Sequence, residues 1–126
     1  MSFEGKTGPY LLYQAVRIKS ILRKAEEAGL TPGPIGPAAK AEQDLVLALD
    51  AIGAAAVGAY DKRAPHILAE HAYALAQAFS GFYASCPILP EPDPAVRSSR
   101  LALASLTLRQ LTLVLDLLGL AVPDRM

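Results

Sequence analysis

The chain has 126 residues, a length that suits one domain with a single hydrophobic core. It is rich in alanine and leucine, lacks tryptophan, and carries 12 basic and 12 acidic residues, so its net charge is zero. This composition favours helix over sheet and excludes a global basic field, so that any nucleic acid must be met by a local patch.

The first expected element is a helix over residues 9–28, opened by a proline and followed by a glycine. Proline suits the first helical turn, where its missing N–H loses no hydrogen bond, and glycine suits the residue after the last turn. Tyr10, Tyr13 and Arg17 recur at helical spacing and therefore share one side. A second, apolar side consists of Leu11, Ala15, Ile18, Leu22 and Ala25. The helix thus presents a core face beside a face of aromatic rings and a guanidinium.

Two further helices follow a connector in which proline and glycine recur at residues 30–37. The second is expected over residues 38–60, and a short polar break at 61–63 separates it from the third, over residues 64–84. Apolar residues of the second helix alternate at steps of four and three, which predicts one core stripe. The core faces are expected to be Leu45, Leu49, Ile52 and Ala56 in the second helix and Leu68, His71, Leu75, Phe79 and Phe82 in the third.

The last helix is expected to follow a second rigid connector at residues 86–92. Asp93 offers an N-cap, Pro94 suits the first helical position, and Gly119 suits the end of the helix. Its apolar seam consists of Leu101, Ala104, Leu108, Leu111, Leu115 and Leu118. Charged residues interrupt the apolar run over residues 101–122, which argues against a membrane span. Four amphipathic helices with short connectors predict an all-α antiparallel bundle.

No catalytic or metal site is expected in this chain. His66 and His71 have no partners at metal-ligand spacing, and the single cysteine, Cys86, excludes an internal disulfide and any zinc site built from cysteines. The glycines of residues 29–36 alternate with prolines, which removes the N–H groups that a phosphate cradle needs. We therefore expect neither catalysis nor a bound cofactor in this chain.

The first helix offers the best candidate binding surface. Basic residues at positions 17–24 lie beside Tyr10 and Tyr13, and RNA-binding proteins use such pairs of features to stack bases and contact phosphates. The alternative is a solvated basic face whose tyrosines anchor the helix on its neighbours. Composition alone leaves both interpretations open.

Four segments carry a family resemblance. Residues 3–21 contain the pattern Gly-Pro-Tyr-x-x-Tyr-x-x-x-Arg, residues 71–83 end in an aromatic pair, residues 99–103 contain Arg-Leu-x-Leu, and residues 117–126 end in methionine. In this order they resemble the C-terminal anticodon-binding domain, the DALR domain, of arginyl-tRNA synthetases. The similar domains of cysteinyl and methionyl enzymes are the nearest alternatives, and the first pattern favours the arginyl branch.

The resemblance implies one helical domain over residues 1–126, with residues 3–28 as junction and first helix and residues 38–126 as the remaining bundle. It implies binding of the tRNA(Arg) anticodon stem-loop, unstacking of the loop, and reading of its middle base, a cytosine. Tyr10 would stack on a base or line a pocket, and Tyr83 would line the same pocket. Met126 would add an apolar contact, and Arg17 would support the pocket or a phosphate.

Two positions depart from the family pattern. Gln14 stands where a small residue, typically alanine, is usual, and Ser80 replaces an expected asparagine or histidine. Gln14 lies beside Tyr13 and is counted with the candidate RNA-binding residues. Its amide would either hydrogen-bond a base or crowd the pocket.

The rest of a synthetase has no counterpart in these residues. Signature motifs of the class I catalytic site are absent, and the family pattern begins almost at Met1, as if at a domain border. We expect an excised C-terminal fragment of a bacterial, cytoplasmic arginine–tRNA ligase whose missing catalytic domain uses ATP and magnesium. The expected partners are tRNA(Arg) and that catalytic domain, with no DNA and no membrane. The alternative is a free-standing DALR-like protein that acts as a protein-interaction module.

Overall fold

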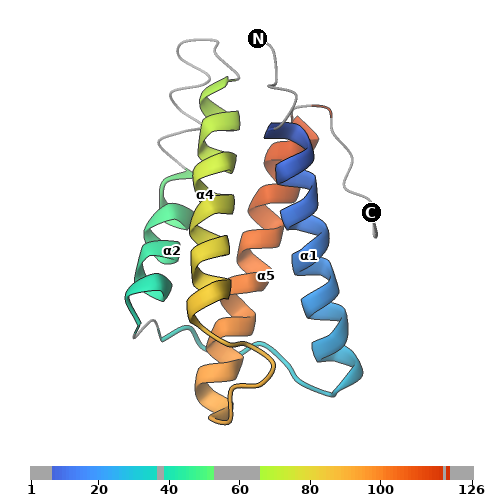
Figure 1. Ribbon diagram of the computed structural model, residues 1–126, viewed down its shortest axis with the longest axis vertical. Helices are drawn as coiled ribbons and strands as arrows, with labels where there is room; N and C mark the ends of the chain where they lie inside the picture. The colour runs from blue at the N-terminus through green and yellow to red at the C-terminus, as the bar shows by residue number, and fades with distance from the viewer. Residues whose placement is uncertain (1–6, 37–38, 53–65, 118, 120–126) are drawn as a thin grey trace.

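The computed structural model describes residues 7–36, 39–52, 66–117 and 119, and these form a bundle of helices without strands. The helices are α1 (Thr7–Glu27), α2 (Lys40–Asp50), α4 (His66–Ser85) and α5 (Pro94–Leu117). Successive helices reverse direction, so that α1 and α4 run the same way and α2 and α5 run the opposite way (Figure 1). The predicted all-α antiparallel bundle is confirmed.

The end of α1 and the start of α5 show the capping interactions that the sequence predicts. Gly29 follows α1 with φ +75°, and the N–H of Leu30 donates to the carbonyl of Ala25 at 2.8 Å. At the start of α5, Asp93 Oδ1 accepts from the N–H of Ala95 at 2.9 Å, which is the expected N-cap contact. The predicted second helix extended to residue 60, but residues 53–65 lie outside the described part of the chain.

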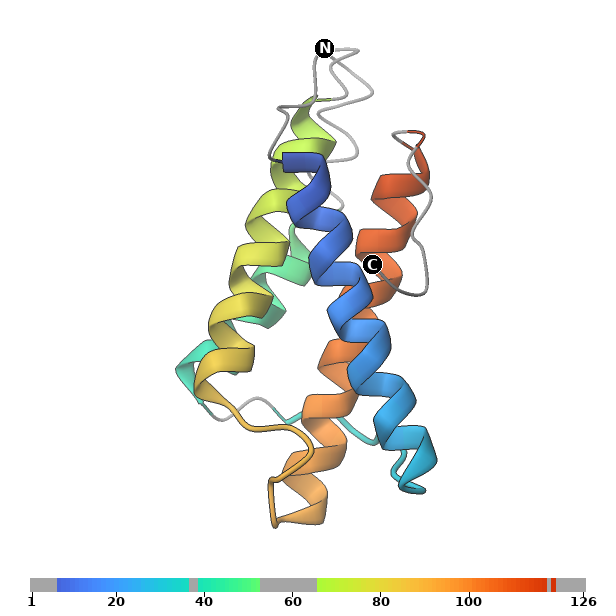
Figure 2. The ribbon, with the colours of Figure 1, turned by 45° about the vertical axis from the view of Figure 1, so that its right-hand side comes forward.

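The core lies between the four described helices, with α4 and α5 in the middle and α1 and α2 packed against this pair from different sides (Figure 2). The predicted apolar side of α1 faces this core, and Leu11, Ala15 and Ile18 are fully buried there. The largest core side chains from the other helices are Leu45, Leu75, Phe79, Phe82, Leu101, Leu103, Leu111, Val114 and Leu115. None of the described helices combines the length and the apolar character needed to cross a bilayer.

The connector after α1 crosses the N-terminal end of α5. The N–H of Gly33 donates to the carbonyl of Ser98 at 3.0 Å, and the N–H of Gly36 donates to Ser99 Oγ at 2.9 Å. A Cβ atom at position 33 would lie 2.9 Å from the Cβ of Ser98. Glycine is therefore needed at position 33 for this close approach.

A buried histidine joins three helices. His71 Nε2 lies 3.2 Å from Gln110 Oε1, and Gln110 Nε2 donates to the carbonyl of Leu49 at 2.8 Å. This chain of contacts runs from α4 through α5 to α2. His71 therefore has a structural place in the core, in agreement with its expected packing role.

Arg100 on α5 makes three side-chain hydrogen bonds to described residues. Its Nε donates to Glu42 Oε2 of α2 at 2.7 Å, and its Nη1 donates to the carbonyl of Pro87 at 2.7 Å and to Glu91 Oε2 at 3.1 Å. The side chains of Arg100 and Glu42 are only 12% and 3% exposed. Burial lowers the pKa of Arg100, but the hydrogen bond and charge of Glu42, with smaller effects of Cys86 and Glu91, outweigh it and raise the pKa. The guanidinium is thus a permanent cation joining α2, α5 and the connector between α4 and α5.

The substitution Arg100→Met is expected to lower the free energy of unfolding by about 3–5 kcal/mol, because it leaves the Glu42 carboxylate buried without its cation. Urea denaturation monitored by circular dichroism measures the loss. The matched control is Lys40→Ala, which removes the exposed 3.1 Å ion pair between Lys40 and Asp44. That loss should stay below about 1 kcal/mol. Equal effects of the two substitutions would contradict the structural role of Arg100.

Candidate nucleic-acid interface

One stripe of α1 faces α4. Tyr10, Gln14, Arg17 and Ile21 follow one another at steps of four, three and four, so they lie along one side of the helix. We call this stripe, together with Tyr73 and Tyr83 of α4, the α1–α4 seam. Because α1 and α4 run in the same direction, the seam has an N-terminal end at Tyr10 and a C-terminal end at Ile21.

The N-terminal end of the seam holds a pair of tyrosines. The ring centroids of Tyr10 and Tyr73 are 5.4 Å apart, and the ring planes are inclined at 51°. Such tilted pairs are a favoured aromatic geometry. Tyr73 remains exposed, so part of this aromatic pair is open to a ligand.

The C-terminal end of the seam is built around Tyr83. The Arg17 guanidinium carbon lies 4.2 Å from the centroid of the Tyr83 ring, which is a cation–π contact. The Phe79 ring is nearly parallel to that of Tyr83, at 19°, with the centroids 6.1 Å apart. The aromatic pair that ends α4 is therefore split, because Phe82 enters the core while Tyr83 stays 40% exposed.

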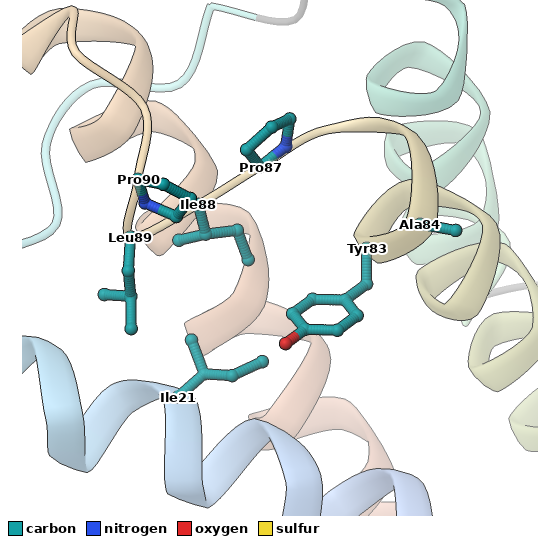
Figure 3. Close-up of a pocket in the computed structure, with 7 residues that line it drawn as sticks. All are labelled: Ile21, Tyr83, Ala84, Pro87, Ile88, Leu89 and Pro90. Atoms are coloured by element: carbon teal, nitrogen blue, oxygen red, sulfur yellow. The ribbon is translucent and has the colours of Figure 1, made fainter.

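A cleft of ≈ 320 Å³ adjoins Tyr83. Its lining residues carry no charge and come from α1, the end of α4 and the connector that follows, namely Ile21, Tyr83, Ala84, Pro87, Ile88, Leu89 and Pro90. The Tyr83 hydroxyl points toward Ile21, across from the wall formed by the connector (Figure 3). Arg100 fixes this wall by its bonds to Pro87 and Glu91. The cleft is thus an apolar hollow beside a ring and a cation.

Two polar atoms in the seam have no hydrogen-bond partner among the described residues. They are Gln14 Oε1 and Arg17 Nε, and both are closed off from solvent. Gln14 is 2% exposed. A buried polar atom without a partner costs about 1–3 kcal/mol, so the seam is destabilising where it is polar.

The structure brings four of the six predicted RNA-binding residues to the seam: Tyr10, Gln14, Arg17 and Tyr83. Tyr13 is exposed, and its ring makes no aromatic or cation–π contact with the other described residues. Met126 lies outside the described residues. The binding role of all six stays a prediction.

Sequence reasoning gave no role to Tyr73 or to the connector wall at residues 87–90. Tyr73 and Tyr83 are ten residues apart on α4, and at 3.6 residues per turn this spacing sets them about 80° apart around the helix, so it gave no signal that pairs them. The connector wall gave no sequence signal either, because its position depends on hydrogen bonds from the side chain of Arg100 in the following helix.

Nothing in the described residues points to metal or thiol chemistry at the seam. They contain no group of three or more histidine, cysteine or acidic side chains able to hold a metal ion. Burial raises the pKa of the Cys86 thiol, Arg100 lowers it and Glu42 raises it, and the net effect is a raised pKa. A buried thiol with a raised pKa is a packing group.

Comparisons with known proteins give a consistent result. The family model described as "DALR anticodon binding domain" matches residues 11–126. The arginine–tRNA ligases of Maricaulis maris and Hyphomonas neptunium are 63% and 60% identical over 125 residues, which is 99% of this chain but 21% of each relative. The structure of Thermus thermophilus arginyl-tRNA synthetase aligns with a TM-score of 0.82 and 36% identity, over 99% of this chain and 22% of that one. The chain thus spans about a fifth of the length of the curated relatives it matches.

The substitution Gln14→Leu is expected to raise the free energy of unfolding by about 1–3 kcal/mol, because it removes a buried acceptor that has no partner. Urea denaturation measures the change, and Gln77→Leu at an exposed position of α4 is the matched control, expected within about 0.5 kcal/mol of the parent. A loss of stability in Gln14→Leu would mean that the amide has a stabilising partner.

Proposed function

The chain belongs to the DALR anticodon-binding domain family, and from this we propose that it binds the anticodon stem-loop of tRNA(Arg) as one domain of an arginine–tRNA ligase. In this role the domain positions the tRNA and reads the anticodon while aminoacylation proceeds elsewhere. ATP and magnesium belong to the catalytic domain, which lies in the four-fifths of the relatives' length that this chain does not match. The parent enzyme acts in the cytoplasm, without DNA or membrane as a partner.

The observation that carries the proposal is the exposed aromatic and basic character of the α1–α4 seam. Tyr73 and Tyr83 are each 40% exposed, and Arg17 is the cation at the surface between the helices. Proteins read unpaired RNA bases by stacking them on such rings, at about 1–3 kcal/mol per base, while cations contact the phosphates. The uncharged cleft beside Tyr83 gives an unstacked base or ribose a place against apolar atoms.

A second candidate function, protein interaction, is favoured by one face of α5. Leu106, Leu113 and Leu117 are exposed and follow one another at steps of seven and four, so they form an apolar stripe. A stripe of this kind suits contact with another protein surface. In the proposed ligase the catalytic domain supplies that surface, whereas a free-standing protein would use it for a separate partner.

The substitutions Tyr83→Ala and Tyr10→Ala are each expected to weaken binding of an arginine anticodon stem-loop by about 5- to 100-fold, since each removes a stacking ring. Fluorescence anisotropy with a labelled stem-loop measures the dissociation constants, and circular dichroism shows that the helices remain. Leu113→Ser on the α5 stripe is the control, and it should leave RNA binding unchanged. Equal binding by the parent chain and both tyrosine variants would contradict the proposed interface.

A further inference from the structure

Gln14 stands apart from every other buried polar side chain of the described core. Glu42 and His71 bond to Arg100 and Gln110, Ser99 Oγ accepts from the N–H of Gly36, and Thr107 Oγ1 donates to the carbonyl of Leu103 at 2.8 Å. Gln14 Oε1 has no partner among the described residues, and the other buried side-chain atom of which this is true is Arg17 Nε on the same stripe. Buried acceptors are rarely left unpaired, and such an atom calls for an explanation outside the fold itself.

The position of Gln14 in the seam supplies that explanation. It lies four residues after Tyr10 and three before Arg17, so its side chain neighbours theirs on the surface of α1. Arg17 covers the ring of Tyr83, the ring on which a base would stack, and its own Nε also lacks a partner. A base that takes the place of the guanidinium over Tyr83 therefore lies beside Gln14 and frees Arg17 to reach a phosphate.

We propose that Gln14 Oε1 accepts a hydrogen bond from the exocyclic amino group of an unpaired cytosine held in the α1–α4 seam against Tyr83. Gln14 is then a specificity-determining residue, and its unpaired oxygen in the free structure is the group that the base satisfies. This inference rests on the proposed function, since it assigns one contact within that RNA-binding site.

The chemistry of the bases explains the selectivity. Cytosine carries an amino donor at C4, where uracil carries a carbonyl acceptor. A uracil in the same pose would place its carbonyl oxygen against Gln14 Oε1, and a hydrogen bond would then require the amide to turn over and present Nε2. Pyrimidin-2-one carries neither the amino group nor the carbonyl at C4, so it leaves Gln14 Oε1 unpaired. A site built to pair a polar group discriminates strongly against a ligand that leaves the group unpaired.

The experiment isolates the amino group by a double-mutant cycle. The 126-residue chain and its Gln14→Met variant are each titrated with two arginine anticodon stem-loops, one with cytosine at the middle position and one with pyrimidin-2-one, which lacks only the amino group. We expect the parent chain to bind the cytosine stem-loop about tenfold more tightly, and the variant to bind the two within about twofold of each other. Methionine keeps the length of the side chain but offers no oxygen.

Two further variants serve as controls. Gln14→Glu keeps an acceptor at the same place and should retain the tenfold preference for the amino group. Gln77→Met changes an exposed glutamine of α4 and should also retain it. Thermal melting of each variant verifies that the helices remain. Gln14→Met should melt no lower than the parent chain if the amide is unpaired in the free protein, whereas Gln14→Glu should melt lower because it buries a charge.

The outcomes separate the inference from the proposed function. An equal tenfold preference in the parent chain and in Gln14→Met would show that another group reads the amine and would overturn the inference. Equal binding of both stem-loops by the parent chain would overturn it as well, leaving Gln14 a packing residue in an RNA-binding domain. If the parent chain does not prefer an arginine stem-loop to an unrelated hairpin of equal length, the proposed function fails and the inference fails with it.

Discussion

The rest of the structure depends on the buried guanidinium of Arg100. Its acceptors come from α2 through Glu42 and from the connector through Pro87 and Glu91, so one cation joins α5 to the connector just before it and to a helix 58 residues away in the chain. The burial of this charge is tolerable because ionised oxygens and a carbonyl surround it. The wall of the cleft beside Tyr83 belongs to the same connector. The shape of the candidate site is therefore set by an ion pair that no ligand needs to touch.

The described structure contains two kinds of buried polar group, those with a hydrogen-bond partner and those without one. Arg100 and Glu42 lie in the core with their charges paired, and they hold elements together. Gln14 and Arg17 lie in the α1–α4 seam with one unpaired buried atom each. A fold selected for stability alone would place apolar side chains there, as it does at Leu11 on the same helix. Buried polar atoms without a partner are expected mainly at functional sites, and in the described structure they lie in the α1–α4 seam.

Much of the fold follows from local sequence signals. Asp93 and Gly29 mark helix ends by their own chemistry, and apolar spacing identifies the buried sides of α1, α4 and α5. The site was less predictable, because spacing cannot say which neighbour covers which edge of a helix. Tyr10 and Tyr13 both follow the pattern expected of one face, yet only Tyr10 meets α4. The spacing likewise gave no sign that Gln14 is buried, because it cannot show what packs against a helix.

The zero net charge limits how such a domain can bind RNA. Proteins that rely on phosphate contacts gain affinity from the release of counterions, and this gain grows with the number of phosphates they neutralise. The 12 cations of this chain are balanced by 12 anions, and the cation–π contact in the seam contributes one of them, Arg17. In the proposed function, stacking on Tyr83 and pairing to a base edge carry the interaction. Stacking adds affinity for any base, and the pairing to a base edge discriminates between bases. The chain makes up about a fifth of its relatives' length, so in the proposed function the remainder of the ligase would supply further tRNA contacts and the bundle would need only to distinguish one anticodon from another.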